Sequence, residues 1–262
     1  MIKKYYKFLL TLIPWIIGFI IFPKLTFFIL LAFGLVYFHH FIFRFRFSFC
    51  EKDMFMFFGL PGSGKTTVCA DIVRQILKKF KSIIAYCNFP ILGAFKCSRD
   101  QIGRVNFCTS EKPNAVLLLD EASTVYFKRS AMNKVKDKKT GQMVNEFSDA
   151  ENSFHSMHRH YHTMEILFAQ SWDGVDLRLR ELSTGLFYVE PSRIRNFIKI
   201  RKIVKIFTIR DEDHQPCDGY EFERFSSRYV WAPPCWKMFD TYHAPELPEV
   251  VPELWYEEGV KE

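Results

Sequence analysis

Residues 59–67 read GLPGSGKTT and constrain the fold more than any other part of this 262-residue chain. The run fits the pattern GxxxxGK[ST], in which glycines let the backbone curl so that its N–H groups face a phosphate. An unbroken apolar run, 54–58, precedes the motif, and 68–80 after it repeats apolar residues at helical spacing. A phosphate site at a helix N-terminus requires this order of strand, loop and helix. The sequence therefore predicts a nucleotide-binding α/β fold.

The motif gives its residues separate roles. Lys65 is expected to reach the β- and γ-phosphates of ATP, and the Thr66 hydroxyl to ligate Mg²⁺. The alternative is a glycine-rich turn with a structural role alone. The residues expected to bind ATP are Gly59, Pro61, Gly62, Ser63, Gly64, Lys65, Thr66 and Thr67.

Two further predicted strands end in polar residues: the apolar run 115–119 is followed by Asp120-Glu121, and the strand at 164–169 is followed by Gln170. Ligands bind outside the carboxyl ends of the strands in open α/β sheets. We therefore expect Asp120 to hold Mg²⁺ through water and Glu121 to polarise the attacking water. Gln170 is expected to sense the γ-phosphate or position water, and a solvent-facing strand end is the alternative.

Arg178 and Arg180 follow Gln170 by a few residues. An arginine supplied by a neighbouring subunit can neutralise charge at a nucleotide, so both are candidates for catalysis in a ring of identical chains. Surface salt bridges are the alternative.

The first fifty residues are almost all apolar or aromatic, with two apolar runs at 8–22 and 25–43. The second run is long enough to cross a ~30 Å hydrocarbon core as a helix. Seven Lys and Arg residues and one acidic residue lie among the first 52 positions, which leaves 29 cations and 28 anions in the rest. This bias predicts a transmembrane hairpin with both termini and the ATPase in the cytoplasm. The alternatives are a cleaved signal peptide and a single or re-entrant span.

The chain length allows one α/β domain and a smaller appendage. The predicted fold class is a P-loop NTPase with a mostly parallel sheet flanked by helices, preceded by the helical hairpin. Seven scattered cysteines without a CxxC pair indicate reduced thiols. The predicted segments are a membrane anchor at 1–47, an NTPase core at 48–210, an extension of the core at 211–245 and an acidic, proline-rich tail at 246–262.

Three further segments carry weaker patterns. Residues 128–146 lack hydrophobic periodicity and predict a hairpin or loop that projects from the core. The helix predicted at 148–162 places the histidines at 155, 158 and 162 on one face, which predicts either a polar face beside the nucleotide or a metal site. Residues 197–209 alternate basic and apolar side chains, as in two short strands or one bulged strand.

Five motifs stand in order along the chain: GLPGSGKTT, Asn88-Phe89-Pro90, VLLLDEA, His158-Arg159-His160 leading into MEILFAQS, and LRLREL. Together they resemble the zonular occludens toxin-like ATPases, a family that includes the assembly NTPase of filamentous phages. The likeness covers roughly residues 53–245. In the family the membrane span follows the ATPase, whereas the apolar runs come first here.

This resemblance implies an ATP-driven motor of the host inner membrane that assembles and extrudes virions with coat or export proteins. We expect a homo-oligomer, with single-stranded DNA as a further candidate partner. One alternative is a DNA-translocating or conjugation coupling or packaging ATPase, which stimulation of hydrolysis by DNA would favour. A second alternative is a nucleotide-binding membrane scaffold that does not hydrolyse ATP.

Overall fold

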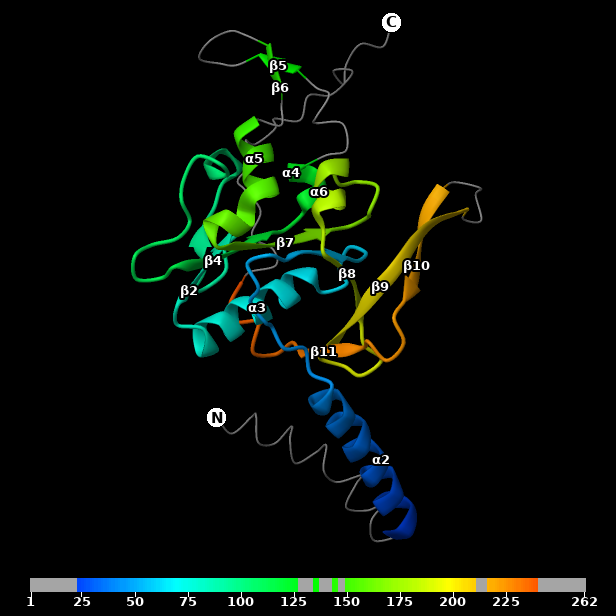
Figure 1. Ribbon diagram of the computed structural model, residues 1–262. Helices are drawn as coiled ribbons and strands as arrows, with labels where there is room; N and C mark the ends of the chain where they lie inside the picture. Colours follow the sequence, from blue (N-terminus) through cyan, green and yellow to red (C-terminus); the bar gives the residue numbers. More distant parts are fainter. Residues whose placement is uncertain (1–22, 127–133, 137–142, 146–148, 211–215, 240–262) are drawn as a thin grey trace, which may run out of the picture.

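The computed structural model describes residues 23–126, 134–136, 143–145, 149–210 and 216–239. In this part of the chain a nine-stranded sheet has the order β10-β9-β8-β1-β7-β4-β2-β3, with β11 also paired to β9 (Figure 1). The strands are β1 Met54–Phe58, β2 Ile83–Cys87, β3 Phe95–Lys96, β4 Asn114–Leu119, β7 Thr163–Ala169, β8 Gly185–Pro191, β9 Phe197–Arg210, β10 Pro216–Phe222 and β11 Arg228–Trp231.

The six strands from β8 to β3 in this order are parallel to their neighbours, and the pairings that involve β9 are antiparallel. All seven residues of β7 are buried. Parallel strands that are covered on both faces carry near-continuous apolar runs, which is why three of them were predictable. The predicted α/β fold with a mostly parallel sheet is confirmed.

Helices cover both faces of this sheet. Side chains of β1 alternate between two hydrophobic clusters: Phe57 packs with α3, whereas Met56 and Phe58 pack with the cluster that contains α4 and α6 residues. In Figure 1, α3 lies on one side of the sheet and α4, α5 and α6 lie on the other. The helices are α3 Lys65–Lys79, α4 Ala122–Val125, α5 Asp149–Met157 and α6 Leu177–Leu182, with 3₁₀ turns η1 Arg99–Gln101 and η2 His158–Tyr161.

Helix α2, Pro23–Ile42, covers most of the second predicted apolar run. Its last turns are docked on the sheet: the His40 ring stacks on Tyr229 at 3.9 Å between centroids, and its Nε2 lies 3.2 Å from the Ser192 hydroxyl. The first predicted run, 8–22, lies outside the described residues. Within the residues that are described, no helix has the length and apolar character needed to cross a membrane. The predicted hairpin is therefore not confirmed.

Two weaker predictions are confirmed in part. Of the segment 128–146, β5 Lys134–Lys136 and β6 Met143–Asn145 pair as an antiparallel hairpin, and the remainder lies outside the described residues. Residues 197–209 form one continuous strand, β9, rather than two. Strand β9 is long because it pairs with three neighbours along its length, β8, β10 and β11.

Two later segments extend the predicted core or differ from the predicted helix. Residues 216–222 and 228–231, within the predicted extension at 211–245, form β10 and β11 of the same sheet as the core. The helix predicted at 148–162 ends at Met157 and continues as a 3₁₀ turn. The predicted tail at 246–262 lies outside the described residues.

Candidate nucleotide site

Three neighbouring strands bring the predicted polar residues to one edge of the sheet. Strand β7 lies between β1 and β4, and all three are parallel. Phe58 pairs with Ala169, and Leu119 pairs with Leu167. The loop that follows β1, Gln170 after β7 and Asp120 after β4 therefore leave the sheet at the same edge.

The glycines of the loop are required by its backbone. Gly62 and Gly64 have φ angles of +75° and +98°, in the left-handed region that favours glycine. A Cβ at Gly59 would lie 2.5 Å from the backbone oxygen of Val189 and 2.6 Å from the Ser63 hydroxyl. Helix α3 begins at Lys65, directly after this curl. Its first N–H groups have no partners within the helix and are available to an anion.

Two polar side chains of the loop fit a bound phosphate. The Ser63 hydroxyl is buried and has no hydrogen-bond partner among the described residues. The Lys65 ammonium bends back over the loop and donates to the backbone oxygens of Gly59 at 2.7 Å and Leu60 at 3.0 Å. Burial lowers the pKa of Lys65, and the charges of Asp120 and Glu121 partly offset this effect. The unpaired Ser63 hydroxyl and the partly buried Lys65 ammonium therefore line the same loop. A hydrogen-bond donor and a cation are the groups that the phosphates of ATP need there.

Thr66 and Asp120 form the predicted magnesium pair. The Thr66 hydroxyl donates to Asp120 Oδ2 at 2.9 Å, across 54 positions of sequence. Burial raises the pKa of Asp120. Three interactions lower it and offset part of this effect: the hydrogen bond from Thr66, the hydrogen bond from the Glu121 backbone and the charge of Lys65. A hydroxyl and a carboxylate beside a phosphate cradle are the oxygen ligands that Mg²⁺ takes in such sites. The residues therefore fit Mg²⁺.

Asn88, in the turn after β2, is a site residue that the chemical reading of the sequence missed. Its Nδ2 donates to the backbone oxygen of Asp120 at 2.8 Å, and its Oδ1 accepts from the Asp120 N–H at 2.8 Å. Strand β2 is the neighbour of β4, so Asn88 leaves the sheet beside Asp120. The signal in the sequence was a polar residue directly after a buried strand. Asn88 therefore fixes the backbone of Asp120, whose carboxylate is the candidate Mg²⁺ ligand.

Glu121 adopts a left-handed conformation, with φ 50° and ψ 44°. This backbone is uncommon for a residue other than glycine, asparagine or aspartate and costs on the order of 1–3 kcal/mol. Residues held in this way cluster at active sites. The Glu121 side chain is exposed, and its N–H donates to Asp120 Oδ1 at 2.9 Å. Glu121 therefore lies beside Asp120 and is open to solvent.

The comparison with known families agrees with this geometry. Residues 55–190 match the family described as ATPase family associated with various cellular activities (AAA). The chain belongs to the AAA family. The match runs from β1 to β8 and so contains every predicted site residue. The predicted P-loop ATPase is confirmed. No curated protein matches the chain.

Two solved structures that are similar to this AAA chain have low sequence identity to it. One is the N-terminal domain of zonular occludens toxin from Neisseria meningitidis, with 13% identity, TM-score 0.43, and coverage of 72% of this chain and 98% of that one. Another is the genome packaging NTPase B204 from Sulfolobus turreted icosahedral virus 2 in complex with ATP-gammaS, with 12% identity, TM-score 0.41, and coverage of 65% and 98%.

The two candidate arginines of this AAA chain differ in their surroundings. Arg180 donates to Asp173 at 3.3 Å, its guanidinium lies 5.2 Å from the Trp172 ring centroid, and its side chain is only 10% exposed. Arg178 is exposed, and its N–H donates to Asp176, which caps α6. The geometry favours the salt-bridge alternative for Arg180. Arg178 stays a candidate for action on a neighbouring subunit.

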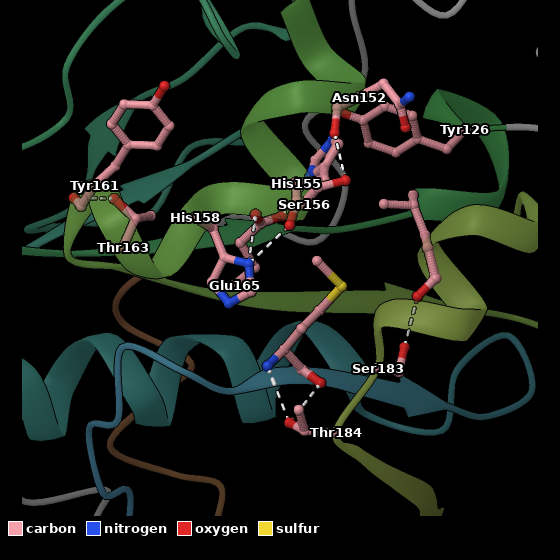
Figure 2. A network of polar contacts seen from close by, with 12 residues as sticks. Tyr126, Asn152, His155, Ser156, His158, Tyr161, Thr163, Glu165, Ser183 and Thr184 are labelled. Carbon is pink, nitrogen blue, oxygen red and sulfur yellow. Dashed lines mark hydrogen bonds and ion pairs between the residues drawn. The ribbon is translucent and has the colours of Figure 1, made fainter.

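The predicted histidine face is divided between two environments. His155 is buried, with Nδ1 2.6 Å from Glu165 Oε2 and Nε2 3.2 Å from the Tyr126 hydroxyl (Figure 2). His158 is also buried, with Nδ1 2.8 Å from the backbone oxygen of His155. His162 turns away and lies 2.7 Å from Glu51. Because α5 ends at Met157, position 162 does not continue its face.

Among the described residues no cluster of three or more His, Cys, Asp and Glu side chains could hold a metal ion. The metal alternative for these histidines is therefore not supported within that part of the chain. His155 and Glu165 instead tie α5 to β7, and Tyr126 links both to the segment after Glu121. Glu165 lies inside the strand that ends at Gln170. His155 therefore supports the frame of the nucleotide site, whereas the predicted polar face beside the nucleotide stays a prediction.

Proposed function

We propose that this AAA chain is an ATP-hydrolysing motor, attached to a membrane, that drives assembly and extrusion of filamentous-phage-type virions. The hydrogen bond between Thr66 and Asp120 carries the ATPase part, because it unites the P-loop helix and the acidic strand end in one magnesium site. The sequence resemblance to the zonular occludens toxin-like ATPases supports the proposed role in virion assembly and extrusion. The exposed apolar side chains of α2 support attachment to a membrane.

The residues at the site divide the work of phosphate transfer. Gly59, Ser63 and the first turn of α3 bind and orient the phosphates, and Lys65 places a cation beside them. Mg²⁺, held by Thr66 and Asp120, would neutralise phosphate charge when bound. Glu121 accepts a proton from the water that it orients. Gln170 follows β7, the strand between β1 and β4, and its proposed role is to sense the γ-phosphate or to position water.

The first test is hydrolysis by the full chain in a neutral detergent, followed by phosphate release with Mg²⁺. Lys65→Ala is expected to lose both hydrolysis and nucleotide affinity, because Lys65 contacts phosphates in the ground and transition states. Glu121→Gln is expected to keep nucleotide binding and lose turnover, because Glu121 acts on the water. Lys96→Ala, at an exposed lysine of β3, is the matched control and should match the unaltered chain.

Equal loss of binding in the Lys65 and Glu121 variants would contradict these roles. No phosphate release from the unaltered chain would favour the scaffold alternative. Addition of single-stranded or duplex DNA tests the translocation alternative. Three cations of β9 count against it, because Lys199 and Arg201 pair with Glu190, and Lys202 pairs with Glu223.

The process is tested in cells that extrude a filamentous phage dependent on this chain. Replacement of the chain by Glu121→Gln should stop release of virions while viral DNA and coat protein accumulate inside the cell. Normal release from cells that carry only the Glu121→Gln chain would refute a role for ATP hydrolysis in extrusion.

A further inference from the structure

A pocket of about 520 Å³ lies where α2 meets the second half of α3. Five of its eight lining residues are cationic: Arg44, Arg46, Arg74, Lys78 and Lys79. They come from two segments, the linker after α2 and the last turns of α3. Like charges gathered in one concave site repel one another unless an anion joins them. The pocket therefore has the charge of an anion site.

One buried carboxylate neutralises only part of this charge. Asp71 is fully buried, accepts from Arg74 and lies 3.8 Å from Arg44. Arg46, Lys78 and Lys79 are exposed, and none of them forms an ion pair within the described residues. Two arginines are thus held in place by the protein, and three cations are left to face a ligand.

The nucleotide is not the occupant of this pocket. The P-loop precedes the N-terminus of α3, whereas Lys78 and Lys79 lie in its last turn. The helix has 15 residues, so its two ends are separated by roughly 20 Å.

An apolar wall distinguishes this pocket from a site for a free inorganic anion. Phe41 and Phe45 line it beside the cations. Phe41 is 51% exposed, and two neighbouring apolar side chains of α2 are exposed as well, Ile42 at 54% and Phe38 at 63%. A ligand that contacts both surfaces has an anionic head and an apolar body. Cations at the end of an apolar helix are the arrangement that favours anionic lipids.

We propose that this pocket binds the phosphate headgroup of an anionic phospholipid, whose acyl chains lie along α2. The inference rests on the proposed attachment to a membrane and adds its lipid class. The linker that lines the pocket is bound to α3 through Gln75, which accepts from the Phe47 N–H at 3.0 Å and donates to the Phe45 oxygen at 3.3 Å. The lipid site is therefore built on the same helix that begins at the P-loop.

The test uses the full chain in a neutral detergent and a fluorescent short-chain phosphatidylglycerol, with binding followed by anisotropy. The variant Arg46→Gln/Lys78→Gln/Lys79→Gln removes the three exposed cations and leaves the Asp71 contacts intact. One Lys or Arg near an anionic membrane contributes a factor of about five, so the affinity should fall about 100-fold. Lys78→Gln alone should lower it about five-fold. The matched control removes three exposed cations elsewhere: Lys96→Gln/Arg104→Gln/Lys237→Gln.

The control variant should bind the lipid within about two-fold of the unaltered chain. Equal weakening in the two triple variants would overturn the proposal, as would equal affinity for phosphatidylcholine. Displacement of the lipid by equimolar inorganic phosphate would show a free-anion site and also overturn it. ATP hydrolysis is measured on the same samples. If the variant Arg46→Gln/Lys78→Gln/Lys79→Gln keeps both its hydrolysis and its lipid affinity, the lipid site alone is refuted. If the unaltered chain does not hydrolyse ATP, the proposed function is refuted.

Discussion

The buried contact between His155 and Glu165 gives the sharpest prediction for stability. The Glu165 side chain is completely buried in the central strand β7, and His155 Nδ1 lies 2.6 Å from it. His158 Nδ1 is 3.9 Å from the other oxygen, too far to take over the hydrogen bond. His155→Leu therefore leaves a buried carboxylate without its partner. Such a loss costs about 3–5 kcal/mol.

A cost of that size is easily measured. For a domain of 150–250 residues, 1 kcal/mol shifts Tm by about 2–4 °C, so a 4 kcal/mol loss predicts a fall of about 8–16 °C. The assay is thermal unfolding of the full chain, followed by circular dichroism at one protein concentration. His160→Leu is the matched control, because His160 is exposed on the adjoining turn and its loss should change stability by less than about 0.5 kcal/mol.

The double variant His155→Leu/Glu165→Leu decides the cause. Replacement of a whole buried pair by apolar residues of similar volume is often neutral or stabilising. The double variant should therefore recover most of the Tm that the single variant lost. If the double variant is as unstable as His155→Leu alone, the loss comes from packing around the histidine and the reasoning from buried charge is refuted.

Three further predictions concern the site. Asn88→Ala should raise the Mg²⁺ concentration for half-maximal hydrolysis by about 10–100-fold, measured by phosphate release, because groups that orient metal ligands have effects of this size; an unchanged Mg²⁺ requirement would contradict it. Asp120→Asn should abolish Mg²⁺-dependent hydrolysis yet stabilise the nucleotide-free fold. Burial raises the pKa of Asp120 in the folded chain above its ordinary value of about 3.8. The unaltered chain therefore loses folding stability as the pH rises from about 3.8 through the pKa of the folded state. In urea unfolding, the extra stability of Asp120→Asn over the unaltered chain should grow across that pH range and vanish below it. If Arg178 acts on the nucleotide of a neighbouring subunit, a mixture of Arg178→Ala chains with Lys65→Ala chains should regain part of the turnover. A mixture of Arg180→Ala chains with Lys65→Ala chains should regain none.

The sequence predicted the parts of the fold that depend on local patterns. Strands β1, β4 and β7 were predictable because each is apolar over most of its length, and the P-loop was predictable because its glycines are required by its backbone. The order of these strands was not predicted, because strand pairing depends on contacts between distant segments. The insertion of β7 between β1 and β4 is what places Gln170 between the loop and the acids.

Other site features left little trace in the sequence. Asn88 acts through two backbone contacts with Asp120, and a single asparagine carries no spacing that would reveal them. The left-handed backbone of Glu121 is likewise invisible in its residue type. The network of His155 had a signal that the helical pattern concealed: Glu165 interrupts a fully buried strand, and a buried acid requires a partner.

Helix α3 connects the candidate nucleotide site to the linker that follows α2. Its first residue, Lys65, closes over the phosphate loop, and one turn from its other end Gln75 holds the linker that follows α2. Gln75 is itself fixed by a 2.7 Å bond to the buried Asp71, so the linker contacts a rigid part of the helix. The linker after α2 is therefore tied to α3 by hydrogen bonds as well as by the chain. In the proposed membrane-attached motor, we expect a displacement of α2 to reach the nucleotide site through α3.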